Sequence, residues 1–180
     1  LEIFGHKCTV WVHAAEPPDR DPIIKHFQTI RAEVRPVSDG FLEARGDAVV
    51  ATYWPTAALA SHAQGFFRRF YLVQDFEPMF YPAGSLSLAA SDSYDRDMDY
   101  ICASKWLEDM LAPYGRWAGH FPLAADTGVY FRDESIVRSE PLKVAFYARR
   151  STPRRSVELG LLALEELARR GVTFEAHLFG

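Results

Sequence analysis

Apolar and polar positions alternate along the chain in short blocks, which predicts strands separated by helices. A solid apolar run at residues 71–73 is typical of a strand buried on both faces. Further strands are predicted at residues 8–13, 34–37, 48–52 and 100–103. Helices are predicted from Asp21-Pro22 with Ile23, Ile24, Phe27 and Ile30 on one face, from Pro55 to about residue 64, at residues 85–92, and from the N-cap Ser104 to Leu111. This alternation predicts an α/β fold with a parallel sheet and right-handed crossovers.

A second block of the same kind follows a break in the pattern. Residues 119–139 lose helical periodicity and carry a polar cluster at 132–135, which indicates a crossing between domains. A strand at 142–147, a helix at 156–170 closed by Gly171, and a strand at 173–178 come next. We therefore predict two doubly wound domains, 1–138 and 139–180. The chain begins without Met and stops after a strand, so we expect residues to be missing at both ends.

Composition narrows the class of protein. Of the 180 residues, 48% are hydrophobic and 24% are charged, as in soluble globular proteins, and the apolar runs are too short for a membrane span. The net charge of −4 argues against a nucleic-acid-binding face. Cys8 and Cys102 form no CxxC motif and are interpreted as buried free thiols in a reducing compartment.

One candidate site follows the strand at residues 71–73. Gln74, Asp75 and Glu77 would emerge at its carboxyl end, where open α/β sheets bind ligands. Three aromatic residues of the same loop, which is bounded by prolines, would line the pocket: Phe76, Phe80 and Tyr81. In the alternative interpretation, Asp75 caps a turn and the aromatic side chains fill a core.

A second candidate site lies between residues 147 and 160, where a strand runs into a helix through four arginines. A helix start offers unpaired N–H groups and partial positive charge, and Arg149 and Arg155 would add bidentate contacts to a phosphate or diphosphate. The alternative is a solvated basic turn.

The basic turn also carries a resemblance to a known family. Ala148-Arg149 followed by Arg155-Ser156 resembles the Gly-Arg…Lys-Gly segment of retaining, nucleotide-sugar-dependent glycosyltransferases with the GT-B architecture, with Ala148 and Ser156 where the family has glycines. LAADTGVYF at residues 123–131 is similar to the turn that joins the two domains of that family, with Asp126 and Phe131 at its Asp and Phe positions.

Three longer segments resemble one particular group within this family. ATYWPTA (51–57), QDFEPMFYPAGS (74–85) and FYARRSTPRRSVELGL (146–161) look like bacterial rhamnosyltransferases that build surface polysaccharides. The likeness covers most of residues 48–180. It implies a GT-B fold of two Rossmann-like parallel-sheet domains, an acceptor-binding one at 1–138 and the truncated start of a donor-binding one at 139–180.

The resemblance also implies the chemistry. A sugar, rhamnose from dTDP-rhamnose, would pass to a saccharide acceptor through an oxocarbenium-like transition state. Arg149 and Arg155 would stabilise the leaving diphosphate without a metal or other cofactor. Asp75 or Glu77 would orient the acceptor hydroxyl or the developing positive sugar, and Gln74 would only donate or accept hydrogen bonds, because an amide does not ionise.

The same resemblance implies a cytoplasmic enzyme with no nucleic-acid partner. The enzyme would work at the inner face of the membrane if its acceptor is membrane-linked. The resemblance is also compatible with an oligomeric enzyme. The isolated chain would be inactive, because the family carries further donor-site residues downstream of this point.

Two other functions remain open from the residues. A non-catalytic α/β domain would bind a phosphorylated ligand through the same basic turn. A metal-dependent transferase would use the Asp-x-Asp pattern of Asp95, Asp97 and Asp99. Those acids precede the strand at 100–103 instead of following one, so we favour surface acids there.

Overall fold

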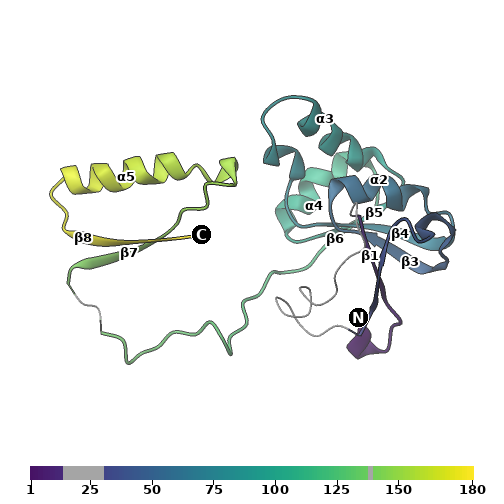
Figure 1. Ribbon diagram of the computed structural model, residues 1–180, viewed down its shortest axis with the longest axis horizontal. Helices are drawn as coiled ribbons and strands as arrows, with labels where there is room; N and C mark the ends of the chain where they lie inside the picture. The colour runs from purple at the N-terminus through teal and green to yellow at the C-terminus, as the bar shows by residue number, and fades with distance from the viewer. Residues whose placement is uncertain (14–30, 138–139) are drawn as a thin grey trace. The chain divides into compact units, whose positions relative to one another are not determined.

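The computed structural model describes residues 1–13, 31–137 and 140–180. The described chain divides into two compact units: unit 1 is Leu1–Pro78 with Pro82–Leu123, and unit 2 is Met79–Tyr81 with Ala124–Gly180. All paired strands are parallel and most are joined by helices, so the fold is α/β and consistent with a Rossmann-like fold (Figure 1). The helix predicted from Asp21-Pro22 and the domain boundary predicted at 138–139 lie outside the described residues.

Unit 1 is built on a four-stranded sheet whose spatial order follows the sequence. Its strands are β3 (Gly46–Ala51), β4 (Phe66–Val73), β5 (Asp99–Cys102) and β6 (Ala118–His120). The connecting helices are α2 (Trp54–His62), α3 (Ser85–Asp92) and α4 (Lys105–Leu111). Figure 1 shows these helices on one side of the sheet, as right-handed crossovers that all step in one direction require.

The order of the strands in this sheet does not reverse, unlike the order in a doubly wound sheet. A doubly wound sheet reverses its order at a switch point, and no reversal occurs between β3 and β6. The N-terminal strands β1 (Thr9–Val12) and β2 (Glu33–Pro36) pair with each other in a separate two-stranded sheet. Among the described strands, the candidate site after β4 therefore does not lie at a switch point of the four-stranded sheet.

The core of unit 1 fills the space between this sheet and its helices. Tyr71 and Val73 of β4 are fully buried, and Tyr100 and Cys102 occupy the equivalent positions on β5. Leu107 and Leu111 of α4 face them. Burial raises the pKa of the Cys102 thiol to about 11, which makes it an inert core group, whereas Cys8 is only half-buried and not buried as predicted.

The described part of unit 2 contains two paired strands and one α-helix. These are β7 (Leu142–Tyr147), β8 (Phe174–Phe179) and α5 (Val157–Arg169). A Cβ at Gly160 would lie 2.1 Å from Cζ of Phe146, so α5 packs on β7 at a position that only glycine fits. Gly171 has a φ of 80° and ends the helix as predicted.

The elements predicted from the sequence are largely confirmed. The predicted strand at 142–147 and helix at 85–92 coincide with β7 and α3. The predicted N-cap Ser104 accepts a hydrogen bond from Leu107 N at 3.2 Å. On α5, Val157 is buried and Leu161 and Leu164 are half-buried as expected, whereas Ala168 is exposed. No helix among the described residues has the length and apolar character that a bilayer crossing needs.

Candidate functional site

The carboxyl edge of the four-stranded sheet carries the first candidate site. Strand β4 ends at Val73, and Gln74, Asp75 and Phe76 follow it directly. Val73 pairs in register with Cys102 on β5, which pairs with His120 on β6. The loops after β3, β4 and β5 therefore meet at this one edge.

Glu77 lies beneath the edge and not on it. It begins the short 3-10 helix η3 (Glu77–Phe80), and only 2% of its surface is exposed. Its Oε2 accepts hydrogen bonds from Tyr71 Oη at 2.8 Å and from Trp54 N at 2.7 Å. Burial raises the pKa of the Glu77 carboxyl group, and these two hydrogen bonds oppose the shift. No substrate can reach this carboxylate in the observed conformation.

The three aromatic residues that were predicted to line the pocket differ in their surroundings. Phe76 stacks on the buried ring of Tyr94, with ring centroids 5.7 Å apart and an interplanar angle of 18°. Tyr94 stacks on Tyr71 in turn, at 5.6 Å. Phe76 is thus a core residue, as in the alternative interpretation of this loop. Phe80 and Tyr81 are half-buried.

Asp75 is the acid that the loop presents at the edge. It is half-buried, and its Oδ1 accepts a hydrogen bond from Phe76 N at 2.9 Å, which turns the chain into the core. Gln74 is exposed, and its amide nitrogen lies 3.4 Å from the carbonyl oxygen of Thr52 after β3. Of the two acids predicted here, Asp75 is the one that a ligand can approach.

The second candidate site is the basic turn between β7 and α5 in unit 2. Arg149 and Arg155 are exposed and stand at the two ends of this turn. The Nε of Arg149 donates to Ser151 Oγ at 3.3 Å, and the guanidinium of Arg155 lies 5.4 Å from the ring centroid of Tyr147. Ser156, just before α5, has a φ of 49°, in the left-handed region that glycine adopts without strain. Ser156 therefore adopts a backbone conformation that side chains other than glycine rarely take.

The segment similar to the family's domain-joining turn forms a local turn. Asp126 Oδ1 accepts from Gly128 N at 2.9 Å, and the carbonyl oxygen of Asp126 accepts from Tyr130 N at 2.7 Å. Phe131 is 71% exposed.

The acids of the Asp-x-Asp pattern lie at the amino edge of the sheet, beside arginines. Asp97 forms ion pairs with Arg69 at 3.3 Å and Arg116 at 2.8 Å, and Asp99 pairs with Arg68 at 3.5 Å. No cluster of three or more side chains suited to metal binding occurs in the part of the chain that the structure describes. The negative charge of Asp97 is therefore balanced by the side chains of two arginines.

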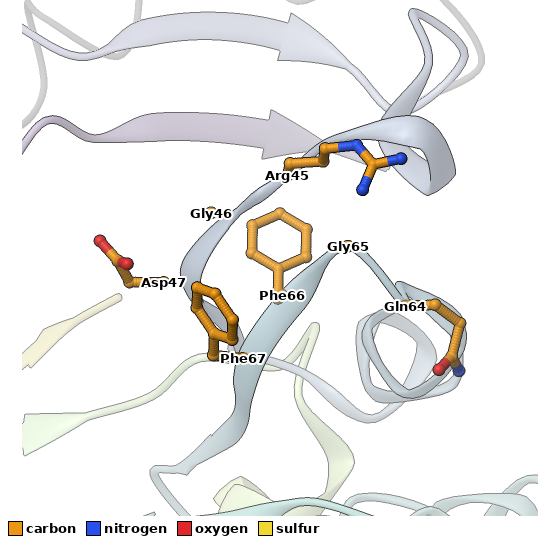
Figure 2. A pocket seen from close by; sticks show the side chains of 7 residues that line it. All are labelled: Arg45, Gly46, Asp47, Gln64, Gly65, Phe66 and Phe67. Atoms are coloured by element: carbon orange, nitrogen blue, oxygen red, sulfur yellow. The ribbon is translucent and has the colours of Figure 1, made fainter.

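The hollow in Figure 2, of about 420 Å³, also lies at the amino edge and so away from Asp75. It surrounds the starts of β3 and β4, and Phe66 and Phe67 form its apolar part. The polar ends of Arg45, Asp47 and Gln64 point away from these rings. Ligand sites need polar groups that converge, so this hollow adds nothing to the candidate site.

One pair of titratable groups at the carboxyl edge was not predicted. His120 ends β6, and its Nδ1 lies 2.5 Å from Oε2 of Glu108 on α4. Trp106, on the same helix turn, meets Phe76 edge-to-face at 6.4 Å. The two residues lie twelve positions apart in the sequence. Their spacing matches no motif, so the sequence alone did not indicate that they pair.

Comparison with known proteins gives one informative match. The chain is 35% identical over 124 residues to the O-antigen biosynthesis protein RfbC of Myxococcus xanthus. The match covers 68% of this chain and 10% of that protein, so the chain spans about a tenth of the relative's length. No protein-family model matches the chain, and no solved structure is significantly similar to it.

Proposed function

We propose that this chain belongs to a glycosyltransferase of bacterial surface-polysaccharide synthesis, which transfers a sugar from a nucleotide diphosphate donor to a saccharide acceptor. The observation that carries the proposal is the strand-to-helix turn of unit 2, where Arg149 and Arg155 lie at the two ends of the turn that leads into α5. The partial likeness to an O-antigen biosynthesis protein supports the polysaccharide context. Rhamnose as the sugar, dTDP as the nucleotide and the GT-B arrangement rest on the family resemblance.

The turn suits a diphosphate for electrostatic reasons. The bond between the sugar and the diphosphate breaks with its electron pair on the phosphate oxygen, so negative charge grows there in the transition state. Two guanidinium groups and the free N–H groups at the start of α5 offer positive charge at that point without a metal. Both arginines are exposed, so an anion can reach them.

The carboxyl edge of unit 1 suits the acceptor. Asp75 can accept a hydrogen bond from an acceptor hydroxyl, and Gln74 can donate to a second sugar oxygen. A charged carboxylate close to the developing positive sugar would also lower the barrier. In this proposal Asp75, and not Glu77, is the acid that touches substrate, because Glu77 is 2% exposed.

A transfer assay tests the proposal directly. The complete protein is incubated with dTDP-rhamnose and a saccharide acceptor, and both released dTDP and extended acceptor are measured. We expect both products in equal amounts, and loss of both with Asp75→Asn. Donor binding without either product would instead favour the second candidate, a domain that only binds a phosphorylated ligand through the basic turn.

A further inference from the structure

The buried carboxylate of Glu77 joins two loops that the sequence separates. Trp54 begins α2, directly after β3, and Glu77 follows β4. Trp54 N is one of the first amides of a helix, which have no partner within the helix. Glu77 Oε2 satisfies it at 2.7 Å from 23 residues away. The carboxylate thus acts as a tertiary cap on α2 and ties the loop after β3 to the loop after β4.

The surroundings of Glu77 hold it in one place. Tyr71 Oη donates to the same oxygen at 2.8 Å, from a ring that is fully buried in the core. The backbone N–H of Glu77 donates to Tyr94 Oη at 3.2 Å. Ser87 of α3 donates to the carbonyl oxygen of Pro78 at 3.0 Å, which fixes the next residue as well. Three elements of unit 1 therefore fix the segment that starts at Glu77.

Asp75 lies two residues before this fixed segment. On its other side, β4 ends at Val73 in a fully paired and buried strand. The loop between the two fixed points has only three residues, Gln74, Asp75 and Phe76, and the ring of Phe76 is itself stacked on Tyr94. The position of the Asp75 carboxylate is thus set by the strand on one side and by Glu77 on the other.

We infer that Glu77 is a positioning residue, which holds the loops after β3 and β4 together and thereby places Asp75 for the acceptor sugar. Its link to transfer rests on the proposed function, whereas its link to the loops does not. A positioning role requires a hydrogen-bond acceptor at this point and no acid. A catalytic role would require an ionisable group.

Two variants separate these roles. Glu77→Gln keeps an oxygen that can accept from Trp54 N and Tyr71 Oη, whereas Glu77→Ala removes it. In the 180-residue chain, we expect Glu77→Ala to speed amide hydrogen exchange at Trp54 by about 10- to 100-fold, the scale of leaving one buried hydrogen-bond donor without its acceptor. Glu77→Gln should leave it within about threefold of the wild type. Unchanged exchange at Trp54 in Glu77→Ala would overturn the anchor itself.

Kinetics of the complete protein supply the second readout. Glu77→Ala should lower kcat and raise the acceptor KM while the donor KM stays constant, and Glu77→Gln should restore all three. Asp75→Asn is the comparison, and it should lower kcat by about 10²-fold or more without changing exchange at Trp54. Loss of transfer in Glu77→Gln with normal exchange would show that the acid itself takes part in the chemistry.

A third variant keeps the test decisive if Glu77→Ala does not fold. Tyr71→Phe removes one of the two donors and preserves the volume of the core, and we expect a smaller rise in exchange at residues 74–77 with transfer retained. Unchanged exchange there would contradict the anchor. If the complete protein transfers no sugar, the proposed function fails while the exchange data still decide the role of Glu77.

Discussion

The two candidate sites are held by different means. In unit 1 the loop after β4 is anchored in a buried network, in which Glu77 is 2% exposed and Phe76 stacks on Tyr94. In unit 2 the turn after β7 is exposed, and its arginines contact Ser151, the ring of Tyr147 and, through Arg154, the ring of Phe80. A hydroxyl must be oriented within tenths of an ångström, whereas a diphosphate is attracted over longer distances by mobile cationic side chains. Under the proposed function, we therefore expect the group that orients the acceptor to be held more firmly than the groups that neutralise the charge of the donor.

The largest expected effect concerns the stability of the anchored region. Tyr94 is fully buried between Tyr71 and Phe76, so Tyr94→Ala should cost about 3–5 kcal/mol of unfolding free energy. The four tryptophans, Trp11, Trp54, Trp106 and Trp117, all belong to unit 1, so tryptophan fluorescence during urea denaturation reports on this unit.

Tyr147→Ala in unit 2 is the matched control. Tyr147 is 36% exposed, and its removal should leave the fluorescence transition within about 0.5 kcal/mol of the wild type, as for surface substitutions. Equal effects of the two substitutions would show that the two regions do not differ in the way described.

The next effect concerns transfer by the complete protein. Arg149→Ala or Arg155→Ala should each lower kcat by about 10²- to 10³-fold, the scale of removing one preorganised group that stabilises transition-state charge. Arg150→Ala is the control from the same turn, and it should retain most of the activity. Near-normal turnover in both test variants would remove the diphosphate assignment.

A smaller effect is the pH dependence of the anchored region. Burial raises the folded-state pKa of Glu77 above its ordinary value of 4.5, so the neutral acid favours the folded state. The stability that this group contributes is complete below pH 4.5 and is lost as pH rises through the folded-state value. Tyr71, Tyr94 and Asp75 face the carboxyl group and stay unchanged in the comparison.

The side chain of Glu77→Gln remains neutral at every pH, so comparison with this variant isolates the effect of Glu77 ionisation on stability. The unfolding free energy of Glu77→Gln minus that of the wild type should therefore increase from pH 4.5 upward and then level off. Urea denaturation of both proteins at one-unit steps between pH 4 and pH 9 measures it. A difference that is constant, or that falls with rising pH, would contradict the stated shift.

The smallest effect concerns the acids at the amino edge. Asp97 is exposed and pairs with Arg69 and Arg116, and such pairs contribute up to about 1 kcal/mol. Asp97→Ala should lower the stability of unit 1 by no more than that and leave transfer intact. Transfer should also continue in the presence of a chelator. A divalent-metal requirement that this substitution abolishes would favour the metal-dependent alternative.

The sequence predicted the strands and helices well because their patterns are local. The apolar run at 71–73 and the caps at Ser104 and Gly171 mark elements that the structure confirms. It did not predict β6, whose three residues Ala118, Gly119 and His120 have no strand-like pattern. It also missed the charged start of β4, where Arg68 and Arg69 are accommodated by ion pairs with Asp99 and Asp97.

The candidate site was predicted in outline only, for a related reason. The sequence placed Gln74, Asp75 and Glu77 at the carboxyl end of one strand, and the structure confirms this for Gln74 and Asp75 but buries Glu77. Which acid is buried depends on Trp54, 23 residues earlier, and on the reach of the Tyr71 hydroxyl. Such contacts across elements leave no periodic signal along the chain, so the division between a buried Glu77 and an accessible Asp75 required the structure.

The most direct test of the account is whether the basic turn binds a nucleoside diphosphate. Titration of the ¹⁵N-labelled 180-residue chain with dTDP, followed by NMR, reports on every assigned amide. We predict saturable shifts concentrated at residues 148–157, which disappear in the Arg149→Ala/Arg155→Ala double variant. The absence of shifts there at millimolar dTDP, or shifts that persist in the double variant, would contradict diphosphate binding at this turn.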